Sequence, residues 1–494
     1  MNSEIQLTAP ATAPERRANN WRQLGVMAGL QLCILLCAMD QTVLNTAIPR
    51  IATTLGGFDR SMWIITSYLL FSTVATPVAG KLSDLFGVKR VLLVATALFT
   101  LFSALCAEAG VFAGILGLDA MNQLIFMRGL QGIAGGAMLG LCFVAIGKFF
   151  VLKERGKLQG LLAASFVVAA LAGPILGGWL VDAWTWQMIF YLNIPFGIAA
   201  CLCLKFCMED SAISHAAPSI DVKGLVTLLL SVLPIMVAAN EIGNTGHFDV
   251  VSVLLVGLSL LMFITFIVCE KVAKEPLIPL VLFRDPIIRV SLVTVFVSGI
   301  GLFGSTLLLS VALQKVLGVS AMMSGLYLAP VMITVALSSV FSGLVVGKTG
   351  HYKLILLIGL VLMSLGSYFL SWTGPQSAAW TMIAYAALAG VGMGFILPVH
   401  TIAVQSIVSA RMMGVGTSMT QFFRSLGGSI GTGFMSALMV CLIKQNSLPT
   451  AVDQMFLLYA VAMLVLVIVN TFVPEASLKS QSLGGSSDPQ DAKC

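Results

Sequence analysis

The chain alternates between long apolar runs and short polar segments. Between Arg289 and Arg411 only three side chains carry a charge at neutral pH, and Lys315, Lys348 and Lys353 each stand between two apolar runs. A helix needs about 20 apolar residues to cross the roughly 30 Å hydrocarbon layer of a bilayer. The runs reach this length, so the pattern predicts a polytopic all-α membrane protein.

Reading the apolar runs in order predicts fourteen transmembrane helices. They are expected at residues 24–48, 62–80, 91–108, 123–147, 158–181, 186–206, 222–241, 250–269, 290–312, 324–346, 354–372, 379–401, 412–441 and 454–473. The predicted organisation is an N-tail (1–23), a six-helix bundle (24–206), a linker with two inserted helices (207–285), a second six-helix bundle (286–474) and a C-tail (475–494). Gly343 and Gly350 repeat the spacing of Gly80 and Gly87 at the corresponding place in the second half, which supports two related bundles.

The composition narrows the class of protein further. With 58% hydrophobic and 10% charged residues and a mean hydropathy of +0.99, the chain leaves no room for a soluble catalytic domain. The net charge of +6 comes without a basic stripe interleaved with aromatic residues, so we expect no nucleic-acid partner. The cysteines and histidines show no zinc-ligand spacing, which predicts no metal site.

An ATP-driven mechanism is not expected either. Residues 342–349 imitate a phosphate-binding loop, but they lack its first glycine and follow an apolar helix where a strand is required. We therefore expect a protein that is not an enzyme, binds no cofactor and is driven by an ion gradient or by the gradient of its substrate.

The distribution of basic residues predicts the orientation. Of the 27 lysines and arginines, four lie in loops that would face outward, two lie within helices, and the remaining 21 lie in the tails and in loops on one side. Cytoplasmic loops accumulate lysine and arginine. The bias predicts both termini on the cytoplasmic side of a plasma membrane, and the first apolar run is expected to be a transmembrane helix and not a signal peptide.

Two charged residues, Asp40 and Arg128, are predicted to lie in the outer third of the membrane. By helical rise, Asp40 is about 24 Å from the inner end of the first helix, and Arg128 is about 8 Å below the outer end of the fourth. Each charge is costly in hydrocarbon, so we expect the two groups to pair. The pair could be a static salt bridge between two helices, or Asp40 could take up a proton while Arg128 biases that uptake.

A third intramembrane charge, Arg424, is predicted about 18 Å from the inner end of the thirteenth helix. Together with Gln421 it could line a substrate cavity, or it could form a buried ion pair that only packs helices. Asn45 and Gln131 are further candidates for the substrate cavity. His400, near the inner end of its helix, could also face a cavity.

The loop after the second helix, residues 80–90, carries a dense group of glycines and charges. Gly80 and Gly87 predict a tight turn, while Asp84 could cap the next helix or pair with Lys89 or Arg90. Such a cluster could latch one conformation, or it could be a plain turn with solvated charges. The segment resembles the loop signature of the major facilitator superfamily, from which it departs at Leu85 and Val88, positions that are usually basic.

The resemblance extends from about residue 36 to 435. Residues 40–49, 128–132 and 186–195 are similar to helix signatures of the fourteen-helix drug/proton antiporter family of that superfamily, and the segment around Arg424 is similar to another. Residues 160–178 resemble its antiporter motif, although Ala169 replaces a glycine. The resemblance implies the major facilitator fold, and it implies that Arg128 takes part in proton coupling.

The antiporter motif also has a direct physical interpretation. Pro174 removes a helical hydrogen bond, and Gly173, Gly177 and Gly178 leave a smooth surface that another helix can approach closely. Tight packing alone would explain the pattern. The resemblance implies in addition that this region closes the exporter against leak.

These observations predict a proton-coupled exporter of amphipathic or cationic small molecules that works by alternating access between two bundles. Its expected partners are the small-molecule substrate and membrane lipid. An exporter of one endogenous metabolite, such as a siderophore, lipid or amino acid, would share every motif, and an importer is disfavoured by the antiporter motif. A channel or a membrane-embedded enzyme would need clustered pore-lining or catalytic polar residues, which the sequence does not provide.

Overall fold

The computed structural model describes residues 13–111, 117, 119–209, 221–245 and 249–474. The predicted C-tail, most of the N-tail and the first part of the linker lie outside these residues. In the first half the helices are α1 (Ala13–Leu55), α2 (Trp63–Phe86), α3 (Val88–Ala107), α5 (Ala120–Phe149), α6 (Leu152–Ala183) and α7 (Met188–Cys207). After them come α8 (Val222–Thr245), α9 (Val250–Val272), α10 (Pro286–Val311), α11 (Ala321–Thr349), α12 (Lys353–Leu370), α13 (Ala379–Ile407), α14 (Met413–Gln445) and α15 (Leu448–Thr471).

Fourteen helices in the described part of the chain are long and apolar enough to cross a membrane, so the predicted all-α, polytopic fold is confirmed. The predicted boundaries are short by a few residues at most ends. The largest difference is at α1, which begins at Ala13 within the expected tail. Residues 15–24 contain neither glycine nor proline, so nothing in the sequence stops the helix where the apolar run begins.

Capping side chains fix several helix starts. The Asp119 carboxylate accepts a hydrogen bond from the Asn122 amide at 2.8 Å at the start of α5, and Asp249 does the same for Ser252 of α9 at 2.8 Å. Asp285 caps α10 in the same manner, just before Pro286 at the first helical position. These caps satisfy amides that have no partner within the helix.

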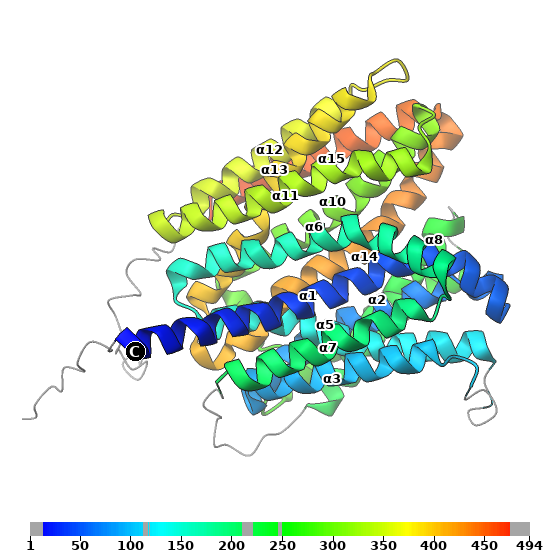
Figure 1. The fold of residues 1–494 in the computed structure, drawn as a ribbon. Helices are drawn as coiled ribbons and strands as arrows, with labels where there is room; N and C mark the ends of the chain where they lie inside the picture. The colour runs from blue at the N-terminus through cyan, green and yellow to red at the C-terminus, as the bar shows by residue number, and fades with distance from the viewer. Residues whose placement is uncertain (1–12, 112–116, 118, 210–220, 246–248, 475–494) are drawn as a thin grey trace, which may run out of the picture.

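The helices form two groups that meet along two long contacts. The first group consists of α1, α2, α3, α5, α6 and α7, and the second of α10, α11, α12, α13, α14 and α15. In Figure 1, α11, α12, α13 and α15 lie on one side and α1, α2, α3, α5 and α7 on the other, with α6, α10 and α14 between them. Across the boundary, α6 packs along α11 and α2 packs along α14. We call the end at which α1 and α14 begin the predicted inner end, because the charge distribution predicts that it faces the cytoplasm.

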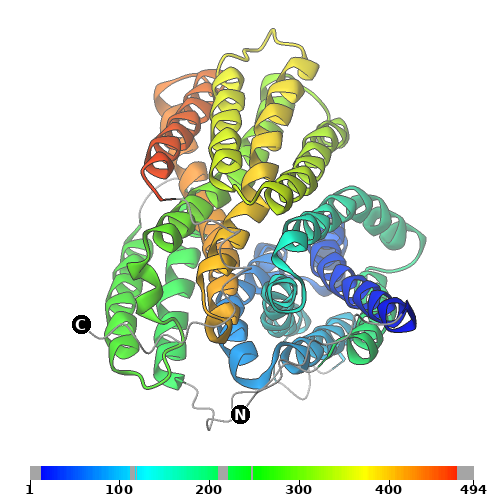
Figure 2. The same ribbon diagram turned by 90° about the vertical axis from the view of Figure 1, so that its left-hand side faces the viewer.

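The two inserted helices are central in the sequence but peripheral in space. α9 packs against α8, and α8 packs against α14 and α2. Figure 2 shows this pair beside α14, drawn in orange, and away from the start of α1, drawn in dark blue. The pair therefore covers the outside of the α2–α14 contact and does not separate the two groups.

Glycines allow both long contacts to be close. Gly156 of α6 faces Gly343 of α11 so closely that a Cβ on either residue would clash with the backbone of the other. On the second contact, a Cβ at Gly80 would clash with Ser418 of α14 and lie 2.6 Å from the Gly414 carbonyl oxygen. Gly80 therefore does not form the turn predicted for it; it lies within α2 at a helix contact.

The turns themselves are made by the second glycine of each repeat. Gly87 joins α2 to α3 with a φ of +87°, and Gly350 ends α11 with a φ of +76°. These φ values favour glycine because a Cβ is strained there. The repeated spacing thus places one glycine at a contact between the helix groups and one at a turn, in both halves.

The Gly156–Gly343 contact gives a test of the packing. Replacing Gly343 with leucine should lower the thermal unfolding midpoint in detergent, because overpacking a close backbone contact costs about 1–3 kcal/mol or more. Gly325 of the same helix has no atom near its missing Cβ, so Gly325→Leu is the matched control. Equal midpoints for the two variants would contradict the close approach of α6 and α11.

Candidate functional site

A buried ion pair joins α1 to α5. Arg128 Nη1 lies 2.6 Å from Asp40 Oδ2, and the two side chains are 1% and 0% exposed. The sequence placed both groups at one depth, and the structure confirms that they are in contact. Burial of two charges in this way is favourable only where further hydrogen bonds satisfy both groups.

Two amides complete the surroundings of the carboxylate. Gln131 Nε2 donates to Asp40 Oδ1 at 3.1 Å, and Asn193 Nδ2 of α7 donates to the same oxygen at 2.9 Å. Gln131 Oε1 also accepts from Arg128 Nη1 at 2.7 Å, and Asn193 donates to Ser103 Oγ of α3 at 3.0 Å. Gln131 was expected in the substrate cavity; it is instead fully buried in this network, because the guanidinium and the carboxylate both need it.

Aromatic rings enclose the guanidinium. Its Cζ lies 4.4 Å from the ring centroid of Tyr68 on α2 and 5.9 Å from that of Phe190 on α7. Arg128 Nε also donates to the Ile64 carbonyl oxygen at 3.3 Å. Four helices, α1, α2, α5 and α7, therefore meet at a single pair of charges.

Sequence reasoning missed Asn193 and Tyr68 as members of this network. Asn193 was recognised only as part of a family motif, although an amide in an otherwise apolar helix is itself a signal that a polar partner is near. Tyr68 gave no signal, because a tyrosine in an apolar helix packs in many ways. Only the structure places it against Arg128.

Asp84 connects the end of α2 to the other helix group. Its carboxylate accepts from Lys148 Nζ at 2.8 Å and from the amides of Gly414 and Val415 at 2.9 Å each. The prediction that Asp84 caps the next helix or pairs with Lys89 or Arg90 is therefore wrong. The first turn of α14 presents unpaired amides and a positive dipole end, which attract the carboxylate more than two solvated cations do.

A second polar contact between the groups lies one turn further into the membrane. Gln159 Nε2 of α6 donates to Gln405 Oε1 of α13 at 3.1 Å. Gln405 Nε2 in turn donates to the Phe143 carbonyl oxygen of α5 at 3.1 Å and is 3.3 Å from Thr417 Oγ1. The side chains of both glutamines are buried, so this contact closes the space between the groups near the predicted inner end. No motif in the sequence predicted this contact.

The segment after α9 is tied to both groups through Glu275. Its carboxylate is 2.7 Å from Lys81 Nζ of α2 and 3.2 Å from Arg411 Nη2, just before α14. The hydrogen bond from Lys81 and the charges of Lys81 and Arg411 lower the pKa of Glu275. The inserted helices are thus attached to the same α2–α14 contact that Asp84 joins.

The glycines of the antiporter motif pack α6 against α1. A Cβ at Gly173 or Gly177 would clash with Thr42 or Thr46, and Thr42 Oγ1 donates to the Ala169 carbonyl oxygen at 3.0 Å. Close packing by these two glycines agrees with the physical interpretation of the motif.

Three other predicted residues do not take part in such contacts. Gly178 has no atom near its missing Cβ, so its predicted place in the smooth surface against a neighbouring helix is wrong; it lies on another face of α6. Pro174 is exposed on α6, and Asn45 is exposed on α1 outside the Asp40 network.

Arg424 has a different environment from that of Arg128. Its Nη1 donates to Gln421 Oε1 at 2.9 Å, and its Nη2 donates to the Leu397 carbonyl oxygen of α13 at 3.3 Å. Within the described part of the chain no carboxylate lies within ion-pair distance of it. The alternative of a buried packing ion pair therefore finds no partner here; the residue is half-buried, and its Nε atom is buried.

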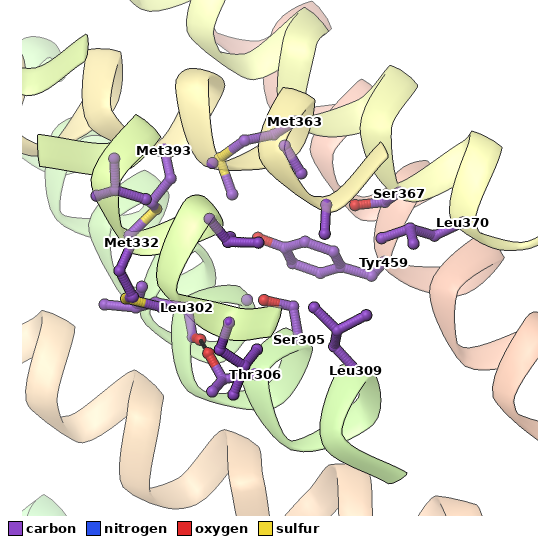
Figure 3. A pocket seen from close by; sticks show the side chains of 17 residues that line it. Leu302, Ser305, Thr306, Leu309, Met332, Met363, Ser367, Leu370, Met393 and Tyr459 are labelled. Carbon is purple, nitrogen blue, oxygen red and sulfur yellow. Dashed lines mark hydrogen bonds between the residues drawn. The ribbon is translucent and has the colours of Figure 1, made fainter. Parts of the chain in front are cut away.

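A pocket lies inside the second helix group (Figure 3). It encloses about 530 Å³ of space between atoms, including its open mouth, and residues of α10, α11, α12, α13 and α15 line it. All lining side chains are uncharged; the labelled ones combine methionine and leucine with the hydroxyl groups of Ser305, Thr306, Ser367 and Tyr459. Such a wall suits the apolar part of an amphipathic molecule.

Comparisons with known proteins agree with this architecture. A family model of the Major Facilitator Superfamily matches residues 30–432. Multidrug transporter protein MdtP of Bacillus subtilis (strain 168) is 34% identical over 84% of this chain and 75% of its own length. Multidrug resistance protein 3 of the same organism is 32% identical over 82% of this chain and 77% of its own length.

Solved structures support the fold. The proton:xylose symporter XylE superposes with a TM-score of 0.63 at 15% identity, covering 94% of this chain and 99% of that one. The Escherichia coli fucose:proton symporter FucP gives a TM-score of 0.62 at 13% identity, covering 91% and 98%. Given the family match, the fourteen membrane helices and these relatives, the chain belongs to the major facilitator superfamily and is a multi-pass membrane transporter, not an enzyme.

Proposed function

We propose that this protein is a proton-coupled exporter of amphipathic small molecules, cationic ones among them, in the cytoplasmic membrane of a bacterium, with both termini inside. The observation that carries the proposal is the buried Asp40–Arg128 pair, because it joins several helices through one titratable group. The multidrug transporters among the relatives support the export of drug-like molecules. A proton gradient would supply the energy for export without a bound cofactor.

The network explains how protonation would be coupled to movement. In its charged form Asp40 accepts hydrogen bonds from Arg128, Gln131 and Asn193. A proton on the carboxylate removes the negative charge that holds the guanidinium, and leaves a buried cation without a counter-charge. The helices α1, α5 and α7 would then move until Arg128 finds new partners, which is the conformational change that transport requires.

The contacts near the predicted inner end supply the second element of the mechanism. The Asp84 contacts with α14 and the Gln159–Gln405 contact both lie toward that end. In this conformation the molecule is therefore held shut on the side that the charge distribution assigns to the cytoplasm. Opening that side must break these hydrogen bonds, so proton binding at Asp40 and closure through Asp84 would be linked steps of one cycle.

Asp40→Asn tests the assignment of the proton site. The amide keeps the shape and most hydrogen bonds but cannot exchange a proton, so dye efflux driven by a pH gradient in reconstituted vesicles should fall to the level of empty vesicles. The amount of protein and its size-exclusion profile should not change. Normal efflux by this variant would refute the assignment.

A double substitution separates coupling from a static salt bridge. Arg128→Ala should block turnover and destabilise the protein by about 3–5 kcal/mol, because it leaves a buried carboxylate unpaired. Asp40→Asn combined with Arg128→Gln removes both charges, so the unfolding midpoint should recover relative to Arg128→Ala while proton-driven efflux stays absent. Active transport by the double variant would show that the pair only staples helices.

Asp84→Asn tests closure at the predicted inner end. Loss of the Lys148 ion pair and of the charge at the start of α14 should weaken the closed form by about 1–2 kcal/mol, a roughly fivefold to thirtyfold change in its population. Initial efflux rates should fall correspondingly, and Lys148→Gln should resemble Asp84→Asn. Lys89→Gln is the matched control, because Lys89 does not touch the carboxylate; an equal loss in this control would argue against the Asp84 assignment.

A further inference from the structure

Arg424 and two neighbouring side chains form a group of polar atoms that the fold does not satisfy. Across the described residues, Arg424 Nε, Gln421 Nε2 and both ring nitrogens of His400 have no hydrogen-bond partner. The Gln421 and His400 side chains are 3% and 0% exposed, so water does not surround them. Buried polar atoms are usually paired, and each exception needs a specific explanation.

The positions of these residues bring the unsatisfied atoms together. Arg424 and Gln421 are neighbours on one face of α14 and share a hydrogen bond. Arg424 reaches α13 at the Leu397 carbonyl oxygen, and His400 lies one turn along α13 from Leu397. His400 is also close enough to the guanidinium to interact with it electrostatically.

The unsatisfied atoms include more donors than acceptors. A guanidinium Nε carries a hydrogen and cannot accept, and an amide Nε2 carries two. A neutral imidazole adds one further N–H, and it keeps one acceptor nitrogen. A cation would therefore meet the protein's own positive charge here, whereas an anionic oxygen would find several donors.

Arg128 shows what the same side chain requires when the fold itself satisfies it. That guanidinium has a carboxylate at 2.6 Å and two aromatic rings around it. Arg424 has an amide oxygen and a carbonyl oxygen, both neutral. Among the described residues a counter-charge is thus present for Arg128, and none lies within ion-pair distance of Arg424.

The location of Arg424 suits a transported molecule. It lies about two helical turns beyond Thr417 along α14, on the predicted outer side of the Gln159–Gln405 closure. Arg424 is half-buried as a residue and its Nε atom is buried, so a transported molecule reaches this atom when the helices around it move apart. Transport needs a site that is empty in part of the cycle, and an unpaired guanidinium fits that requirement.

We propose that Arg424, Gln421 and His400 bind the carboxylate of an amphipathic anionic substrate, which supplies the negative charge that the fold lacks. The proposal rests on the proposed export function and adds a substrate class to it, beside the cationic molecules expected from the sequence. The planar guanidinium donates to one carboxylate oxygen through Nε, and the Gln421 amide donates to the carboxylate from the same helix face.

A matched pair of probes tests this proposal directly. The probes are dansylaminoundecanoate and its methyl ester, which differ only in the charge of the head group. Their binding to the full-length protein in phosphatidylcholine nanodiscs is measured by dansyl emission, with empty discs subtracted. The wild-type protein should bind the carboxylate about tenfold to a hundredfold more tightly than the ester, the usual effect of hydrogen bonds to a charged group.

Substitutions on α14 identify the group responsible. Arg424→Gln should remove the preference for the carboxylate, and Arg424→Lys should retain part of it, because the charge remains while the Nε donor of the planar guanidinium is lost. Lys444→Gln removes an exposed positive charge from the same helix and should bind both probes as the wild type does. Equal binding of both probes by the wild type would overturn the proposal, as would equal weakening of both by Arg424→Gln, which would mean a packing role.

Two further measurements keep the outcomes distinct. Phosphatidylglycerol added to the discs should not compete with the carboxylate probe; competition would reassign the site to an anionic lipid head group and overturn the substrate proposal. Ethidium efflux driven by a pH gradient tests the export function separately. If wild-type ethidium efflux depends on Asp40 while the probes bind equally, the export function stands and the carboxylate site fails.

Discussion

A polar group that is buried within a membrane has to find its partner inside the protein, because hydrocarbon offers none. This constraint produces the helices themselves, since each helix satisfies its own backbone. It also makes each intramembrane polar side chain informative. Asp40 and Arg128 are tolerated because each is the other's partner, with Gln131 and Asn193 supplying the remaining hydrogen bonds.

The same constraint distinguishes the two intramembrane arginines by their surroundings. Arg128 is satisfied by the fold, so a change in the charge of Asp40 disturbs several helices at once. Arg424 has neutral partners at Nη1 and Nη2 and no partner at Nε among the described residues, so the proposed partner of this atom is the transported molecule. One arginine would then respond to the proton and the other to the substrate. Both lie on helices that pack along the boundary between the two groups or adjoin it, so either event can affect the same movement.

Near the predicted inner end, helices of the two groups approach each other closely because glycines lie at their contacts. Gly156 and Gly343 bring α6 and α11 together, and Gly80 brings α2 to α14, where Asp84 reaches the first amides of that helix. The two contacts are related by the internal repeat, but only the α2–α14 contact carries the acidic residue of the repeat, Asp84, because Gly347 stands at the corresponding place in α11. The segment after the inserted helices strengthens the α2–α14 contact through Glu275, so the two contacts close by similar packing and different electrostatics.

The sequence by itself determined the number of helices, the all-α class and the depth of Asp40 and Arg128, because apolar run length and helical rise are local properties. It also identified the glycine repeats and the polar residues around Arg424. Only the tertiary structure decided the partners: Asp84 with α14 in place of Lys89, and Gln131 within the ion-pair network in place of an open cavity. Partner choice depends on which distant helix faces a side chain, and helix periodicity does not encode that relation.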